Sequence, residues 1–299
     1  MRKSLIQAAK WAWLVCVLVA AGLVIARSWD EIVEMLRGLA PLLLVGSIVL
    51  TAVAKLLLAE NARIAADRCG VSLHYLQAAR LYNLSQLGKY LPGSIWQFVG
   101  RAAAYRNLGA TFPQIRDSLL TESLWILAAA ALVGALLTGP GIVDVVTQAL
   151  SPALAWWLVG LAGLGLLAVA AIAVYRWSTL LAYLELLVPP VRAVFVQAVI
   201  WVLLGAAFWC LLSASGIHAG LWFPIGLFAA AYAVGFMVPF APAGLGVRDG
   251  ILVLGLLPFT TTAEAVAIAL LARVVYLVVD VALALGPELV LLVARPRSL

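Results

Sequence analysis

Val238–Gly250 reads Val-Pro-Phe-Ala-Pro-Ala-Gly-Leu-Gly-Val-Arg-Asp-Gly, which places helix breakers and two charged residues within otherwise apolar sequence. An arginine at the centre of a bilayer costs roughly 2.5 to 3.5 kcal/mol on insertion scales. Lipid also offers no hydrogen-bond partner to backbone that Pro and Gly leave unpaired. We therefore expect this stretch to belong to a functional site.

The composition of the chain is typical of a polytopic membrane protein. Of its 299 residues, 66% are hydrophobic and only 11% are charged, and the mean hydropathy is +1.12. Soluble domains carry about 25% charged residues. No segment outside the apolar stretches is long enough to bury a core of its own, so we expect a single integral membrane domain over residues 1–299.

Apolar stretches of about 20 residues predict six full crossings of the membrane. Their bounds are Leu5–Ala26, Leu39–Ala59, Ser118–Thr138, Ala153–Tyr175, Val194–Ser213 and Ala263–Leu285. Two further apolar regions, Tyr75–Gly109 and Leu221–Pro258, are broken by Pro and Gly near the middle, which predicts two re-entrant hairpins. The predicted fold class is an all-α polytopic membrane protein.

The distribution of Lys and Arg predicts the orientation of these spans. The N-terminal arm is basic, residues 63–116 hold seven Lys or Arg, and the C-terminal tail carries two Arg, whereas loop 27–37 has three acids against two bases. The positive-inside rule then places both termini in the cytoplasm. This parity requires the two hairpins to enter from opposite faces, which is typical of an inverted repeat.

An arginine follows the helix breakers in each broken region. Leu91–Gly93 precedes Arg101, and Ala241–Gly244 precedes Arg248. The guanidinium group stays charged and binds phosphate oxygens through two parallel hydrogen bonds, and helix N-termini that begin after these breakers add N–H donors for an anion. The pattern predicts a phosphate site at the two apices, with Lys89 attracting head groups at the cytoplasmic mouth.

The last predicted span carries a polar face. Arg273, Tyr276 and Asp280 are spaced three and four residues apart and therefore lie on the same side of a helix. A buried ion pair between Arg273 and either Asp280 or Asp249 would spare both charges an unpaired position in lipid. The alternative to a binding role is that these pairs only lock the helices together.

Glu122 and Trp96 leave several roles open. Glu122 is expected to pair with Arg101 or Arg116, to carry a coupling proton, or to act as a counterion at a helix end. Most tryptophans fall at span ends, where an aromatic belt is expected. Trp96 lies just beyond the first Pro-Gly apex instead and either lines a site or packs in the core.

These motifs resemble the lysylphosphatidylglycerol synthase transmembrane family, the flippase-like domain of multiple peptide resistance factors. The resemblance rests on Gly244–Gly250 and Ala265–Tyr276 in the second half and on Gln86–Trp96, with Arg101 and Glu122 beyond it, in the first. It covers about Tyr82 to Asp280. It implies a protein of a bacterial or archaeal cytoplasmic membrane that moves, or helps to move, a lipid with a charged head group between leaflets.

Two departures from the family limit what the resemblance implies. Members often have Glu where this chain has Asp249, and the resistance factors also carry a soluble aminoacyl-transferase domain, so we do not expect aminoacylation of phosphatidylglycerol by this chain alone. Its Lys-Tyr-Leu-Pro-Gly variant at residues 89–93 resembles members associated with glycan or glycolipid assembly.

Missing motifs narrow the mechanism. The sequence has no phosphate-binding loop for ATP, so transport is expected to be passive, ion-coupled or driven by a partner. It has no visible catalytic motif, and its cysteines lack metal-ligand spacing, so we expect no enzyme, cofactor or metal site. The basic residues flank spans, which argues against nucleic acid as a partner.

Two alternatives remain beside a flippase of phosphate-bearing lipids. One is a membrane partner of a lipid- or glycan-modifying enzyme, and the other is an integral membrane transferase that acts on a lipid-linked substrate. The residues predicted to bind substrate are Arg248, Asp249, Arg101, Arg273, Asp280, Tyr276, Glu122, Lys89, Gly244, Gly246, Pro92, Gly93 and Trp96.

Overall fold

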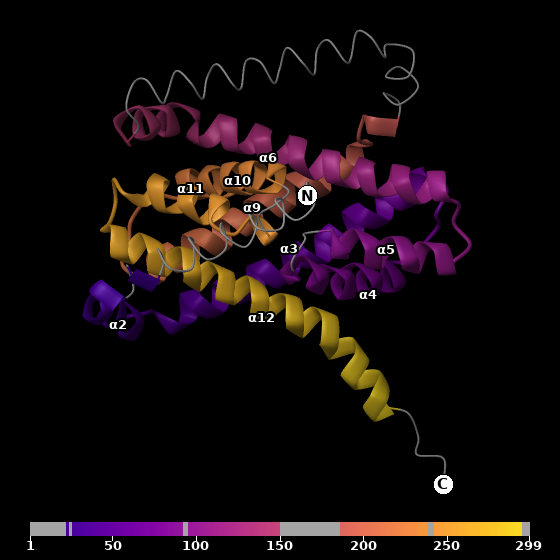
Figure 1. The fold of residues 1–299 in the computed structure, drawn as a ribbon, viewed down its shortest axis with the longest axis horizontal. Coiled ribbons are helices and arrows are strands. Elements are labelled where there is room, and N and C mark those ends of the chain that lie inside the picture. Colours follow the sequence, from indigo (N-terminus) through magenta and orange to yellow (C-terminus); the bar gives the residue numbers. More distant parts are fainter. Residues whose placement is uncertain (1–21, 24–25, 92–94, 150–185, 239–241, 295–299) are drawn as a thin grey trace, which may run out of the picture.

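The structure is a computed structural model that describes residues 22–23, 26–91, 95–149, 186–238 and 242–294 (Figure 1). All regular elements in these ranges are helices, which confirms the predicted all-α class. Four of them are long and apolar enough to cross a membrane: α3 (Pro41–Arg68), α6 (Phe112–Ala149), α9 (Val191–Ala214) and α12 (Thr262–Ala294). The chain is therefore a multi-pass membrane protein.

These four helices coincide with four of the six predicted spans. The predicted spans Leu5–Ala26 and Ala153–Tyr175 fall almost entirely outside the described residues. A short helix, α2 (Trp29–Arg37), precedes α3 and contacts α12.

Both broken regions form the predicted pairs of short helices. The first hairpin consists of α4 (Tyr75–Gln86), the 3-10 turn η1 (Leu87–Tyr90) and α5 (Trp96–Asn107). The second hairpin consists of α10 (Trp222–Met237), the 3-10 turn η2 (Pro242–Gly244) and α11 (Val247–Leu256). The two helices of each hairpin contact each other, and η1 contacts η2, so the apices of the two hairpins meet.

The described chain repeats one order of elements, a long helix, a hairpin and a second long helix. The first helices of the two halves, α3 and α9, are antiparallel. The N–H of Ala40 before α3 donates to the carbonyl of Ala214 at the end of α9 (3.0 Å), and Arg192 near the start of α9 donates to Glu60 near the end of α3 (2.5 Å). Figure 1 places α4 and α5 toward one end of the long helices and α10 and α11 toward the other. These observations fit the predicted inverted repeat.

Small residues let α10 sit deep among the long helices. A Cβ atom at Gly205 of α9 would lie 2.3 Å from the Cα of Ile225, and one at Gly226 would lie 2.6 Å from Thr138 of α6. Membrane helices use such positions because lipid gives them no hydrophobic drive to associate, and close packing takes its place. With 16 residues, α10 rises only about 24 Å. It is therefore shorter than a hydrocarbon core of about 30 Å.

Candidate functional site

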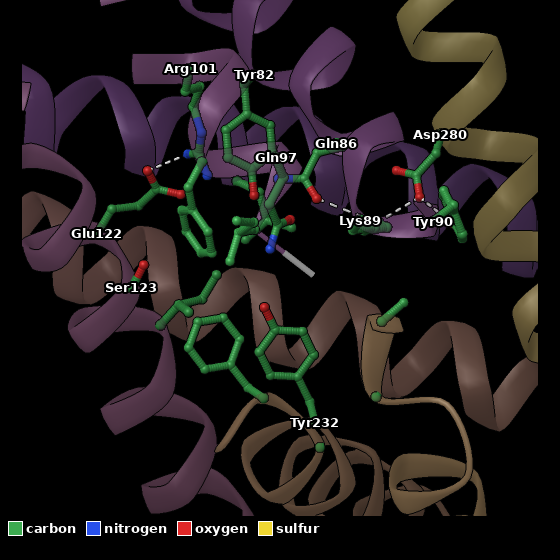
Figure 2. A pocket seen from close by; sticks show the side chains of 18 of the residues that line it. Tyr82, Gln86, Lys89, Tyr90, Gln97, Arg101, Glu122, Ser123, Tyr232 and Asp280 are labelled. Atoms are coloured by element: carbon green, nitrogen blue, oxygen red, sulfur yellow. Dashed lines mark hydrogen bonds and ion pairs between the residues drawn. The ribbon is translucent and has the colours of Figure 1, made fainter. Parts of the chain in front are cut away.

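A cavity of about 850 Å³ lies where the two hairpins meet α3, α6 and α12. Figure 2 shows Arg101 and Glu122 at one side of it and the cluster of Lys89, Tyr90 and Asp280 at the other. Eight of the thirteen predicted site residues line this cavity: Arg248, Arg101, Arg273, Asp280, Tyr276, Glu122, Lys89 and Gly244. Pro92 and Gly93 lie outside the described residues.

The first hairpin is fastened to α6 by a buried ion pair. Arg101 on α5 is only 2% exposed and pairs with Glu122 on α6, which is 4% exposed. The guanidinium group also lies over the ring of Tyr82, 4.8 Å from its centre. Arg116, the other predicted partner of Glu122, instead pairs with Asp117 (2.7 Å). The charge of Arg101 is thus neutralised by Glu122.

The apex of the first hairpin is fastened to α12 through Asp280. One carboxylate oxygen of Asp280 lies 2.5 Å from Nζ of Lys55 on α3, and the other lies 2.6 Å from both Nζ of Lys89 and the hydroxyl of Tyr90, which donates to it. Lys89 therefore binds Asp280 inside the cavity, whereas the sequence suggested a role for it at the mouth.

Gly88 gives the first apex its shape. A Cβ atom at this position would lie 2.7 Å from both the amide nitrogen of Gln97 and the carbonyl carbon of Trp96 at the start of α5. Both contacts are to backbone, so a side chain would push η1 away from α5. Lys89 and Tyr90, which follow directly, hold Asp280 only from the present position of η1.

We expect Gly88→Ala to lower stability by about 1 to 3 kcal/mol, as overpacking does. Thermal unfolding of the purified protein would measure this loss. Gly100→Ala on the same hairpin is the matched control, because its Cβ would meet Ser85 at an ordinary 3.7 Å. Equal behaviour of the two variants would contradict this role of Gly88.

The second hairpin is fastened to α12 by Asp249. Arg273 donates from Nε and Nη2 to the two carboxylate oxygens of Asp249, at 2.7 and 2.6 Å, which decides between the two predicted partners of Arg273. The N–H of Gly246, which has φ +84°, donates to the same carboxylate (2.9 Å) and so caps α11. Asp249 and Gly246 do not line the cavity; they position α11.

The two halves thus use corresponding ion pairs with reversed charge. In the first half, the arginine lies on the hairpin and the acid on the long helix that follows. In the second half, Asp249 lies on the hairpin and Arg273 on the long helix. Each pair joins the second helix of a hairpin to the next long helix.

Asp249→Glu is expected to be tolerated, with a stability close to that of the natural protein. A glutamate at the third position of a helix can accept the same N–H bond, as in a capping box, and can still reach Arg273. Asp249→Asn keeps the length of the side chain but loses the charge, so we expect a larger loss of stability. Thermal unfolding would compare them, and a Glu variant less stable than the Asn variant would contradict the prediction.

Arg248 differs from the other cavity arginines because no carboxylate binds it among the described residues. It lies in the first turn of α11, is 8% exposed, and its guanidinium carbon lies 4.7 Å from the ring centre of Phe228 and 4.8 Å from that of Tyr276. Its Nε and Nη2 atoms are buried and have no hydrogen-bond partner, and neither does the hydroxyl of Tyr276. Arg248 and Tyr276, which both line the cavity and lie against each other, therefore keep donors without a protein partner.

Glycines make room for this arginine. A Cβ atom at Gly235 of α10 would lie 3.0 Å from the Cβ of Arg248, and one at Gly244 would lie 3.2 Å from it. Gly244 also has φ +69°, in the left-handed region that glycine adopts without strain. Gly244 ends η2, and α11 begins three residues later at Val247, so the small size of Gly244 serves the packing of Arg248.

The rest of the cavity wall is largely apolar and reaches the outer surface of the helices. Leu120 on α6 is 51% exposed, Val274 on α12 is 54% exposed, and Ile95 before α5 is 58% exposed, and all three line the cavity. In a membrane protein such exposed apolar side chains face lipid. The cavity therefore joins a charged interior to apolar openings.

Trp96 was predicted either to line a site or to pack in the core. Trp96 is 48% exposed and does not line the cavity, so the structure supports neither predicted role.

Several residues that line the cavity were not predicted from the sequence. Figure 2 shows two of them, Tyr232 and Gln97, reaching toward each other across the space. The most buried of those with polar side chains is Lys55, and the sequence did carry a signal for it, because a lysine inside an apolar span indicates a functional residue. Those with polar side-chain groups are Lys55, Tyr82, Gln86, Tyr90, Gln97, Arg116, Ser123 and Tyr232.

Comparison with known proteins identifies the family of this chain. The family described as the lysylphosphatidylglycerol synthase TM region matches residues 12–284, which is most of the chain. A search of curated proteins found no match. The match includes both hairpins, all four long helices up to residue 284 and every charged residue of the cavity. The chain belongs to the lysylphosphatidylglycerol synthase transmembrane family.

Proposed function

We propose that this protein moves an anionic phospholipid or a polyprenyl-phosphate-linked glycolipid between the leaflets of a bacterial or archaeal cytoplasmic membrane, without an ATPase of its own. The observation that carries the proposal is the buried Arg248, which lines a cavity with largely apolar walls and has donors without a protein partner. A lipid has the same two parts, a charged phosphate and apolar chains.

The physical problem of such movement is the charge. A phosphate that crosses about 30 Å of hydrocarbon needs polar partners throughout. The guanidinium group of Arg248 supplies paired N–H donors and a full charge, and it lies in the first turn of α11, where the helix dipole also favours an anion. Amide and hydroxyl groups of Gln86, Gln97 and Tyr232 can take the hydrogen bonds of the remaining head group.

The acyl or prenyl chains do not need to leave lipid. The exposed apolar residues of α6 and α12 on the cavity wall give the chains a path from the cavity to the surrounding membrane. The head group can thus occupy the cavity while its chains remain among the lipids. This division supports a lipid as substrate better than a soluble anion.

The test is translocation of head-group-labelled lipids in liposomes that contain the purified protein. Phosphatidylglycerol and a polyprenyl-phosphate glycan would be compared with empty liposomes, in the absence of ATP. We expect the protein to accelerate the movement of at least one of them. No movement of any lipid, with protein shown to be folded, would contradict the proposal and favour a non-transporting membrane partner of a lipid- or glycan-modifying enzyme.

A further inference from the structure

We infer that the head group taken up by this cavity carries two negative charges and no ammonium group. The inference rests on the proposed function and adds the charge of the substrate to it. It follows from the balance of acids and bases in the cavity, from the place of the two unbalanced cations, and from the partners that the carboxylates and aromatic rings already have.

The cavity has two more basic than acidic groups among the described residues. The bases that line it are Lys55, Lys89, Arg101, Arg116, Arg248 and Arg273. Glu122 and Asp280 line it as well, and Asp249 and Asp117 pair with two of the arginines from just outside. Four carboxylates thus oppose six cations. Residues 92–94 and 239–241, which border the apices, contain no ionisable side chain in the sequence.

Three cations, Lys55, Lys89 and Arg248, lie around the single carboxylate of Asp280 and the ring of Tyr276. Nζ of Lys55 is 4.3 Å from the ring centre of Tyr276, and the guanidinium carbon of Arg248 is 4.8 Å from it, so the two groups are at most about 9 Å apart. Like charges this close repel strongly in a medium of low polarity. Asp280 neutralises one of the three cations, so a single negative charge on the ligand would leave one cation unbalanced, whereas a dianion balances the other two.

Lys89 is the lysine that can turn toward the ligand. Lys55 and Lys89 share the single carboxylate of Asp280, so only one of them is needed to neutralise it. The Lys55 side chain is 4% exposed and belongs to a long helix, while that of Lys89 is 17% exposed and belongs to the apical turn η1. Arg248 and Lys89 are therefore the two cations available to a dianion.

The carboxylates at the cavity leave no place for an ammonium group. Each carboxylate is occupied, because Glu122 holds Arg101, Asp249 holds Arg273, and Asp280 holds two lysines and Tyr90. Aromatic rings are the other partners of a cation. Among the rings that line the cavity, that of Tyr82 already lies against Arg101, and that of Tyr276 lies against Lys55 and Arg248. The ammonium group of a zwitterionic or aminoacylated head group would therefore enter a cavity whose carboxylates are paired and whose excess charge is positive.

A matched series of lipids tests the inference by direct binding. The full-length protein in a neutral detergent would be titrated at pH 8 with four dioleoyl lipids: phosphatidic acid, phosphatidylglycerol, phosphatidylethanolamine and lysylphosphatidylglycerol. A phosphate monoester has a second pKa of about 6 and is a dianion at this pH. We expect phosphatidic acid to bind roughly tenfold more tightly than phosphatidylglycerol, and the two amine-bearing lipids to bind more weakly than either.

Variants of Lys89 locate the second charge. Lys89→Gln is expected to reduce the preference for phosphatidic acid over phosphatidylglycerol to less than threefold, while Lys89→Arg keeps it. Arg106→Gln is the control for net charge, because Arg106 lies on the same hairpin, is exposed and does not line the cavity. If Lys89→Gln fails to fold, the lipid series on the natural protein decides the inference alone.

Equal affinity for the four lipids, or tightest binding of lysylphosphatidylglycerol, would overturn the inference and leave the proposed lipid transport intact. Glycerol phosphate at the same concentrations provides a head group without chains. Binding of glycerol phosphate as tight as that of phosphatidic acid would overturn the choice of a lipid as ligand. Failure of every lipid to bind folded protein would instead contradict the proposed function itself.

Discussion

Arg248→Ala is expected to abolish lipid movement in proteoliposomes and to leave insertion and folding intact. Arg248 has unpaired donors and no carboxylate partner among the described residues, so its removal strips no acid of a counterion. It does remove the cation that would balance a phosphate in the cavity. The rate of head-group translocation should fall to that of empty liposomes, while the thermal unfolding midpoint should stay the same or rise.

Two further variants show what the arginine supplies. Arg248→Lys keeps the charge but loses the planar pair of donors, and we expect it to transport at an intermediate rate. Arg106→Ala removes an exposed arginine from outside the cavity and should transport normally. Transport at the natural rate by a folded Arg248→Ala protein would exclude Arg248 as the phosphate partner.

Glu122→Ala is expected to have the opposite result, a large loss of stability. It leaves Arg101, which is 2% exposed, without its acid in the interior of the protein. Breaking a buried ion pair by removal of one partner costs about 3 to 5 kcal/mol. Thermal unfolding in detergent would show this as a markedly lower midpoint, and the yield of folded protein should fall with it.

The double variant Arg101→Met, Glu122→Leu separates a structural from a functional role of this pair. Replacing both partners by apolar residues of similar size is often neutral or stabilising, so we expect the unfolding midpoint to return close to the natural value. The charge difference of two in the cavity is unchanged, and most of the transport should return as well. A stable double variant that does not transport would mean that the pair acts on the lipid directly.

The fold was predictable where the signal is local. Long apolar runs predicted α3, α6, α9 and α12, because the thickness of the bilayer sets the length of a span. Pro and Gly near Leu91 and Ala241 predicted the two breaks, because these residues end helices wherever they occur. Charge placement predicted opposite entry of the hairpins, which the antiparallel course of α3 and α9 fits.

The pairing of charges was not predictable, because it depends on which helices meet. The sequence offered Arg273 two partners, Asp280 on the same helix and Asp249 on another. Only the packing of α11 on α12 decides for Asp249. The same packing places Arg248 without a carboxylate although its neighbour in sequence is an acid. Lys55 carried a usable signal, a single lysine within an apolar span.

The place of α12 between the hairpins has a mechanical consequence. Asp280 of this helix binds the apex of the first hairpin, and Arg273, seven residues earlier, binds the start of α11 in the second. Seven residues of a rigid helix span about 10.5 Å. A hairpin that tilts must either break its ion pair or displace α12 and strain the other pair, so this one helix acts as a shared lever that makes movements on the two sides of the protein interdependent.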